Sequence, residues 1–339
     1  MNINKFNKEI QKYLHKKDGN CMFNSHCNNE LQKCHSIQNG FILKRLKDEN
    51  NNVYFLHEKD DKFQLNLTNV RSATTFYGYC NYHDSKIFSI IDFKNAKDLS
   101  SLSNNHYFTF FFRELSNEMY KKKRSKKLFK ILSEAVKNED KSEIKSVFKF
   151  YNNPENKITF NIESYEYLNG LYEGTSKALL QLDKIFNNSL NQLKNQRIPK
   201  MLHFKYILDK EVSFSVSSLI SPSFYYKNVE FNNHPDYPFQ YSCLVIFPIK
   251  NKTLILLISP IEFWQQFLYF RQFFFKESKE KLEILLSKKI LENIENIVIS
   301  PKINNSNSIA KKLSEIMFKS NLNPYELISD NEVINLFDL

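Results

Sequence analysis

Cysteine and histidine residues are concentrated in one short part of this chain. Four of the five cysteines and four of the eight histidines lie between residues 21 and 83. They are Cys21, His26, Cys27, Cys34, His35, His57, Cys80 and His83. Residues 85–339 contain one further cysteine, Cys243. Two early and two late ligand residues, separated by a span that can fold into a hairpin, are typical of a zinc site.

The most economical set of four zinc ligands takes two residues from each end of this span. These are Cys21, Cys27, Cys80 and His83. The Cys80-x2-His83 spacing at the start of a helix lets both side chains face one ion. The Cys21-x5-Cys27 spacing is wider than the usual separation of about two to four residues. The fourth ligand therefore stays open between His83 and three alternatives, which are His26, Cys34 and His35. The clustering also has an interpretation without a metal, in which the cysteines are reduced and buried and the histidines lie at the surface by chance.

The chain carries a large excess of positive charge. Its formal net charge is +11 and its pI is about 9.1, which suits a polyanionic partner such as DNA or RNA. The densest basic run is KKKRSKK at residues 121–127. Its candidate phosphate contacts are Lys121, Lys122, Lys123 and Arg124. Two alternatives stay open, namely codon bias toward lysine in an AT-rich genome and a helix face that meets only solvent.

Several classes of protein have little support in the sequence. There are only 5 glycines, and neither GxGxxG nor GxxxxGK[ST] occurs, which argues against glycine-loop nucleotide-binding folds. The first twenty residues are polar and basic and contain no apolar signal-peptide core. The longest apolar run, Thr253–Trp264, is too short to span a bilayer and contains Pro260. We expect a cytoplasmic protein without a membrane partner, in which reduced cysteines favour metal ligation over disulfides.

The pattern of apolar residues predicts an α+β protein in three parts. We expect a zinc-binding module at 1–100, a helical segment with the basic run at 101–198, and a C-terminal domain of helices on a mainly antiparallel sheet at 199–339. Strands are predicted at 53–56, 63–67, 201–208, 212–220, 241–249 and 252–259. Helices are predicted at 1–17, 81–88, 105–138, 170–193, 260–275, 278–293 and 306–319.

The segment at residues 20–92 resembles the treble-clef zinc fingers of the HNH endonuclease group. Cys34-His35-Ser36-Ile37 stands where that family carries its first histidine, and Cys80-Asn81-Tyr82-His83-Asp84 stands where its closing metal-binding pair lies. It is also similar to bacterial proteins with a Ser-His-Ser-Ile step followed by Gly-x-Cys-x2-His-Asp. One departure is Cys34, which replaces the acidic or histidine residue that the family has before its base.

The resemblance implies a ββα zinc module with a catalytic role. His35 would be the general base, Asp84 would bind a catalytic Mg²⁺ or Mn²⁺ ion, and His83 would bind the structural zinc. The leading hypothesis is therefore a zinc-binding protein that acts on nucleic acid, and its catalytic version is a metal-dependent endonuclease of the antiviral defence or toxin kind. Two alternatives remain. One is a non-catalytic zinc finger that binds nucleic acid or a partner protein, and the other is a sensor whose zinc is purely structural.

Overall fold

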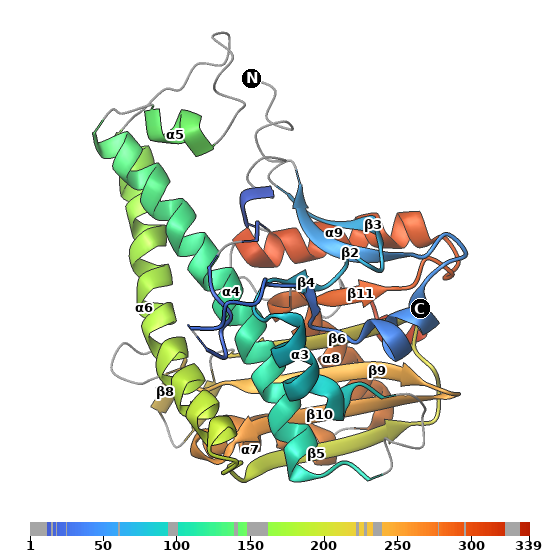
Figure 1. Cartoon of the computed structure of the whole chain (residues 1–339). Helices are drawn as coiled ribbons and strands as arrows, with labels where there is room; N and C mark the ends of the chain where they lie inside the picture. The colour runs from blue at the N-terminus through green and yellow to red at the C-terminus, as the bar shows by residue number, and fades with distance from the viewer. Residues whose placement is uncertain are drawn as a thin grey trace.

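A seven-stranded antiparallel sheet runs through the centre of the molecule (Figure 1). Its order is β3-β2-β11-β6-β9-β10-β5, and each neighbouring pair is antiparallel. The strands are β2 (Asn52–Lys59), β3 (Lys62–Asn69), β5 (Met201–Leu208), β6 (Phe214–Ile220), β9 (Ser242–Ile249), β10 (Lys252–Pro260) and β11 (Ile297–Ile299). The predicted α+β class with a mainly antiparallel sheet is confirmed.

This computed structural model describes residues 12–14, 16–17, 19–24, 26–59, 62–93, 101–138, 142–147, 162–221, 224–226, 229–232, 239–276, 278–294, 296–322 and 333–339. Within these ranges, two further pairs of strands form small antiparallel sheets. β1 (Cys34–His35) pairs with β4 (Thr75–Phe76), and β7 (Phe224–Tyr226) pairs with β8 (Val229–Phe231).

The helices cover both faces of the large sheet (Figure 1). The α-helices are α2 (Lys44–Leu46), α3 (Asn81–Phe88), α4 (Asn104–Lys137), α5 (Ser142–Val147), α6 (Ile162–Lys194), α7 (Trp264–Lys276), α8 (Lys279–Asn293) and α9 (Ser306–Leu322). Single π or 3-10 turns are η1 (Asn39–Leu43), η2 (Ser89–Ile91), η5 (Ile261–Phe263) and η6 (Leu336–Asp338). The helix predicted at 1–17 falls largely outside the described residues.

The central strands β9 and β10 are apolar on both faces because both faces are covered. Successive side chains of a strand point to opposite sides, so Val245 and Phe247 join the core beneath α4 whereas Leu244 and Ile246 join the core beneath α7 and α8. The turn between the two strands places Asn251 at a φ of 60°, a left-handed conformation that asparagine adopts more readily than most residues.

The sheet is assembled from both ends of the described chain. Strand β2 pairs with β11, aligning Phe55 with Val298 and Tyr54 with Ile299. The hairpin of β2 and β3 thereby extends the sheet that residues 201–299 otherwise build. The division into three parts at residues 100 and 198 stays a prediction, while the sheet itself takes strands from the first and third of those ranges.

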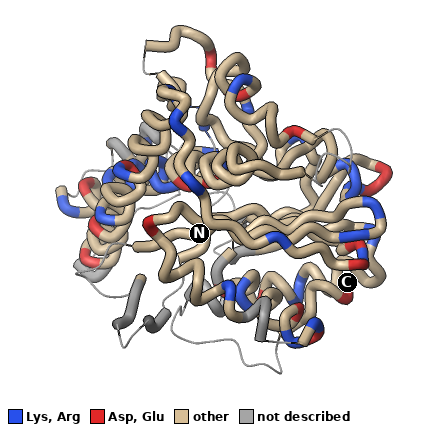
Figure 2. The backbone as a smooth tube through the Cα atoms, turned by 90° about the horizontal axis from the view of Figure 1, so that it is seen from below, with Lys and Arg blue, Asp and Glu red and all other residues tan. Residues whose placement is uncertain are grey.

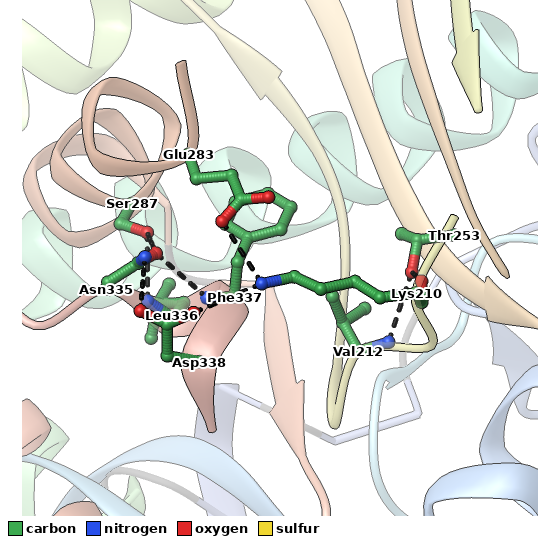
Figure 3. Close-up of polar contacts among 9 residues, drawn as sticks. All are labelled: Lys210, Val212, Thr253, Glu283, Ser287, Asn335, Leu336, Phe337 and Asp338. Carbon is green, nitrogen blue, oxygen red and sulfur yellow. Dashed lines mark hydrogen bonds and ion pairs between the residues drawn. The ribbon is translucent and has the colours of Figure 1, made fainter. Parts of the chain in front are cut away.

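The last residues of the chain are held by polar contacts with α8 and with the loop before β6 (Figure 3). The ammonium of Lys210 lies 3.1 Å from carboxylate oxygens of both Glu283 and Asp338. The backbone N–H of Leu336 donates to Ser287 Oγ at 2.9 Å. These contacts place the ring of Phe337 edge-on against Phe214, with the ring centroids 5.2 Å apart.

A buried polar network joins the small β1–β4 sheet to the large sheet. The carboxylate of Glu114, on α4, accepts from Ser217 Oγ at 2.7 Å and from Asn296 Nδ2 at 3.3 Å. The same Asn296 nitrogen lies 2.9 Å from Ser36 Oγ, directly after β1. All four side chains are buried. Burial raises the pKa of Glu114 to about 8, and the hydrogen bond from Ser217 only partly opposes this shift.

Glu114→Gln should flatten the pH dependence of stability. In the native protein, the folded-state pKa of about 8 lies above the ordinary value of 4.5. The stability that this group confers is therefore fully present below about pH 4.5 and is lost as the pH rises through about 8. Glutamine has no such titration. Urea unfolding at several pH values across this window measures the difference, with the exposed Glu134→Gln on the same helix as the control. An equal decline in the native protein and in Glu114→Gln would contradict the prediction.

Candidate metal centre

Four side chains converge at the N-terminal end of α3. The Sγ atoms of Cys21, Cys27 and Cys80 and the Nδ1 atom of His83 all lie within 4.8 Å of one another. His83 Nδ1 is 3.3 Å from the sulfurs of Cys21 and Cys80 and 3.7 Å from that of Cys27, and the Cys27 and Cys80 sulfurs are 3.7 Å apart. A tetrahedral zinc ion sets its ligands roughly 3.8 Å apart for two sulfurs and roughly 3.6 Å apart for sulfur and nitrogen. These four residues are therefore close enough to hold a metal ion, as predicted.

Two successive turns explain the wide spacing of the first pair. The N–H of Asn24 donates to the Cys21 carbonyl at 3.2 Å, and the N–H of Cys27 donates to the Asn24 carbonyl at 3.0 Å. These two turns fold the loop back, so that the sulfurs of Cys21 and Cys27 both lie in the cluster. The N–H of Met22 also donates to the Gly78 carbonyl at 2.8 Å, which ties this loop to the segment that leads into Cys80.

The second pair is placed by the start of α3. Cys80 is the residue that caps this helix, and its sulfur accepts from the backbone N–H of His83 at 3.5 Å. Burial raises the pKa of the Cys80 thiol, but the hydrogen bond from His83 and those from Cys27 and Cys21 outweigh it, so the net pKa is lowered. Burial also lowers the pKa of His83. Both shifts favour the thiolate and the neutral imidazole, which are the forms that bind metal.

The alternatives for the fourth ligand lie outside this cluster. Cys34 is buried, and its sulfur lies 3.6 Å from the Gln32 carbonyl. His26 is exposed. His35 Nδ1 lies 3.1 Å from the Ala73 carbonyl. In the part of the chain that the structure describes, the Cys21–Cys27–Cys80–His83 group is the one set of three or more such side chains close enough to share an ion.

His35 and Asp84 are both mostly enclosed and share two charged neighbours, Arg113 and Asp92. Burial lowers the pKa of His35 to about 4, and the positive charge of Arg113 adds to this shift. Burial raises the pKa of Asp84, which Arg113 and a hydrogen bond from Cys34 partly oppose. Arg113 is itself buried, with one guanidinium nitrogen 3.0 Å from Asp92. The sequence did not point to Arg113 or Asp92, because isolated charged residues carry no spacing pattern.

The basic run on α4 is largely engaged within the molecule. The predicted phosphate contact Arg124 is buried, with its guanidinium 4.4 Å from the centre of the Tyr13 ring. Lys122 pairs with Glu118 at 3.4 Å, and Lys123 reaches Asp183 at 3.8 Å. Figure 2 shows basic residues interspersed with acidic ones along these helices. Nucleic-acid binding by Lys121, Lys122, Lys123 and Arg124 stays a prediction.

No family model, curated protein or solved structure matches the chain. Any functional assignment therefore depends on the geometry of the site itself. Among the helices that the structure describes, none combines the length and apolar character needed to cross a bilayer.

Gly78 allows the loop that carries Cys21 and Cys27 to approach Cys80 closely. A Cβ atom at this position would lie 2.7 Å from Phe76 Cε2 and 3.2 Å from Met22 Sδ, and the buried Phe76 ring has no room to move. We expect Gly78→Ala to lower the free energy of unfolding by about 1–3 kcal/mol and to weaken metal retention. Thermal unfolding and metal content measure the two effects.

The matched control is Gly174→Ala on α6, where nothing lies within 4 Å of the added methyl group. Alanine is the better helix former by about 0.5–1 kcal/mol, so this variant should be slightly stabilised. If the two variants had the same unfolding temperature and the same metal content, the packing around Gly78 would have no special role.

Proposed function

We propose that Cys21, Cys27, Cys80 and His83 bind one structural zinc ion in a treble-clef module. The observation that supports this is the set of separations between the three sulfurs and His83 Nδ1, which fits the edges of a zinc-centred tetrahedron. Protein atoms would supply all four coordination positions of this zinc ion. This is typical of structural zinc sites, because catalytic zinc sites keep one coordination position for water.

The order of the local elements supports the same assignment. A loop carries the first two ligands, the β1–β4 pair follows, and α3 carries the last two ligands at its N-terminus. A metal ion here would join the loop that carries Cys21 and Cys27 to the start of α3. Because the unfolded chain offers no preformed site, the free energy of metal binding contributes to the stability of the module.

Protein purified without added metal should contain one zinc ion per chain. Cys80→Ser should lose the zinc and unfold at lower temperature, because serine is a poor zinc ligand and the site also stabilises the fold. Cys34→Ala should keep the zinc, because this buried cysteine lies outside the cluster. Elemental analysis and thermal unfolding test both variants. Folded, reduced protein without zinc would refute the assignment, and loss of zinc in Cys34→Ala would show that the ligand set is different.

A second candidate function is phosphodiester hydrolysis of DNA or RNA at His35 and Asp84. The observation that favours it is the buried guanidinium of Arg113, whose charge acts on both residues. A guanidinium keeps its positive charge when buried, so it favours an anionic group close to His35 and Asp84.

His35 has the features of a weak general base. If Nδ1 carries the proton and donates to the Ala73 carbonyl, the lone pair is on Nε2, which can take a proton from water. The water oxygen then forms a bond to phosphorus, and the bond to the leaving sugar oxygen breaks as that oxygen takes a proton from solvent water. Asp84 supplies the carboxylate that would hold Mg²⁺ or Mn²⁺, an ion that would offset the negative charge developing on the phosphate. Cys34, beside Asp84, is a sulfur donor that such ions do not favour.

His35→Ala should lower cleavage of DNA or RNA by about 10²–10⁴-fold, as expected for loss of a general base, without loss of zinc. His26→Ala is the matched control, because His26 is exposed and lies outside the cluster. Cleavage is measured with Mg²⁺, Mn²⁺ or EDTA. If the native protein cleaves neither nucleic acid under these conditions, the hydrolytic function is wrong, and the structural zinc assignment is unaffected.

A further inference from the structure

Two aromatic rings flank the imidazole of His83 at the surface of the metal centre. Phe23, in the loop that carries Cys21 and Cys27, has its ring centroid 4.5 Å from that of the imidazole. Tyr82, next to His83 on α3, meets the imidazole edge-on with the centroids 5.1 Å apart. Tyr82 is 59% exposed and Phe23 is half-buried. The packing of the module therefore leaves most of the Tyr82 ring open to another molecule.

A lysine ammonium lies over each of these two rings. Lys86 Nζ is 5.7 Å from the centre of the Tyr82 ring, and Lys194 Nζ, at the end of α6, is 5.3 Å from the centre of the Phe23 ring. Both distances are within the range of about 6 Å for a cation–π contact. Both lysines are exposed, and neither pairs with a carboxylate among the described residues. The metal loop, α3 and α6 thus bring rings and cations together.

The positive charge at this surface exceeds what the metal centre balances. Burial lowers the pKa of His83, and the charges of Lys86 and Lys194 lower it further, with no carboxylate of the described residues opposing them. A zinc ion held by three thiolates and a neutral imidazole carries one net negative charge, which the two ammonium groups outnumber. The ligand that suits the surface is therefore an anion that also presents a flat ring.

We propose that this surface binds single-stranded nucleic acid, with an unpaired base stacked on Tyr82 and the neighbouring phosphates held by Lys86 and Lys194. Aromatic rings beside cations are how proteins bind single strands without reading their sequence. A duplex keeps its bases stacked on one another, so it offers no base to the ring without a cost in unstacking. The surface rests on the proposed zinc module for its placement, but it does not require hydrolysis at His35 and Asp84.

Fluorescence anisotropy with the full chain, without added Mg²⁺ or Mn²⁺, tests the proposal. The probes are a single-stranded DNA, a single-stranded RNA of the same sequence, and the DNA duplex. At least one single strand should bind more tightly than the duplex, and the tighter of the two identifies the nucleic acid. Tyr82→Ala should weaken binding of that strand by about tenfold, because one base loses its stacking partner. Tyr82→Phe keeps the ring and should bind as the native protein does.

The two lysines are tested by the salt dependence of binding. Lys86→Gln and Lys194→Gln should each weaken binding and lower the slope of log affinity against log salt by about 0.7, which corresponds to one phosphate contact on a single strand. The matched controls are Tyr167→Ala on α6, where the tyrosine is 69% exposed, and Lys312→Gln on α9, where the lysine is exposed. Both should bind as the native protein does.

Zinc content is measured in every variant, because Tyr82 contacts His83. Tyr82-dependent binding by zinc-free protein would support this surface and refute the zinc assignment, and binding without cleavage would support it and leave hydrolysis wrong. The proposal is overturned if the duplex binds as tightly as both single strands, if zinc-containing Tyr82→Ala binds as the native protein does, or if both lysine variants keep the native salt slope. Equally tight binding of a polyglutamate peptide would also overturn it.

Discussion

Closure of the Cys21–Cys27–Cys80–His83 cluster is the constraint on which the N-terminal part of the molecule depends. The described residues of the loop at 21–27 contain no regular secondary structure, and α3 is only eight residues long, so neither is stable by itself. A metal ion bound by both would fix their relative position. The β1–β4 pair, with only two residues in each strand, lies between them in the sequence.

This module is not isolated from the rest of the protein. Its hairpin, β2 and β3, continues the large sheet through β11, and the network of Ser36, Asn296, Glu114 and Ser217 connects the end of β1 to α4 and β6. Each member of the network is buried, so loss of one removes a hydrogen bond from each of its partners in a region that excludes water. A disturbance at the metal centre should therefore reach the central sheet.

The parts of this structure that follow local rules could be predicted from the sequence. The cluster around His83 could be predicted because Cys80 and His83 have helical spacing. The strands at 241–249 and 252–259 could be predicted because they are continuous apolar runs on either side of a turn. The long-range features of the fold could not be predicted from the sequence. Pairing of β2 with β11 joins residues about 240 positions apart, and Arg124 contacts Tyr13 across a sequence separation of 111 positions.

X-ray absorption spectroscopy at the zinc edge tests the central claim most directly, because it measures the atoms that surround the ion. The proposed site predicts a first shell of three sulfurs at about 2.3 Å and one nitrogen at about 2.0–2.1 Å, with the nitrogen lost in His83→Ala. A shell of four sulfurs would mean that Cys34 replaces His83. A shell of oxygen and nitrogen alone would mean that zinc binds elsewhere, and it would contradict the proposed centre.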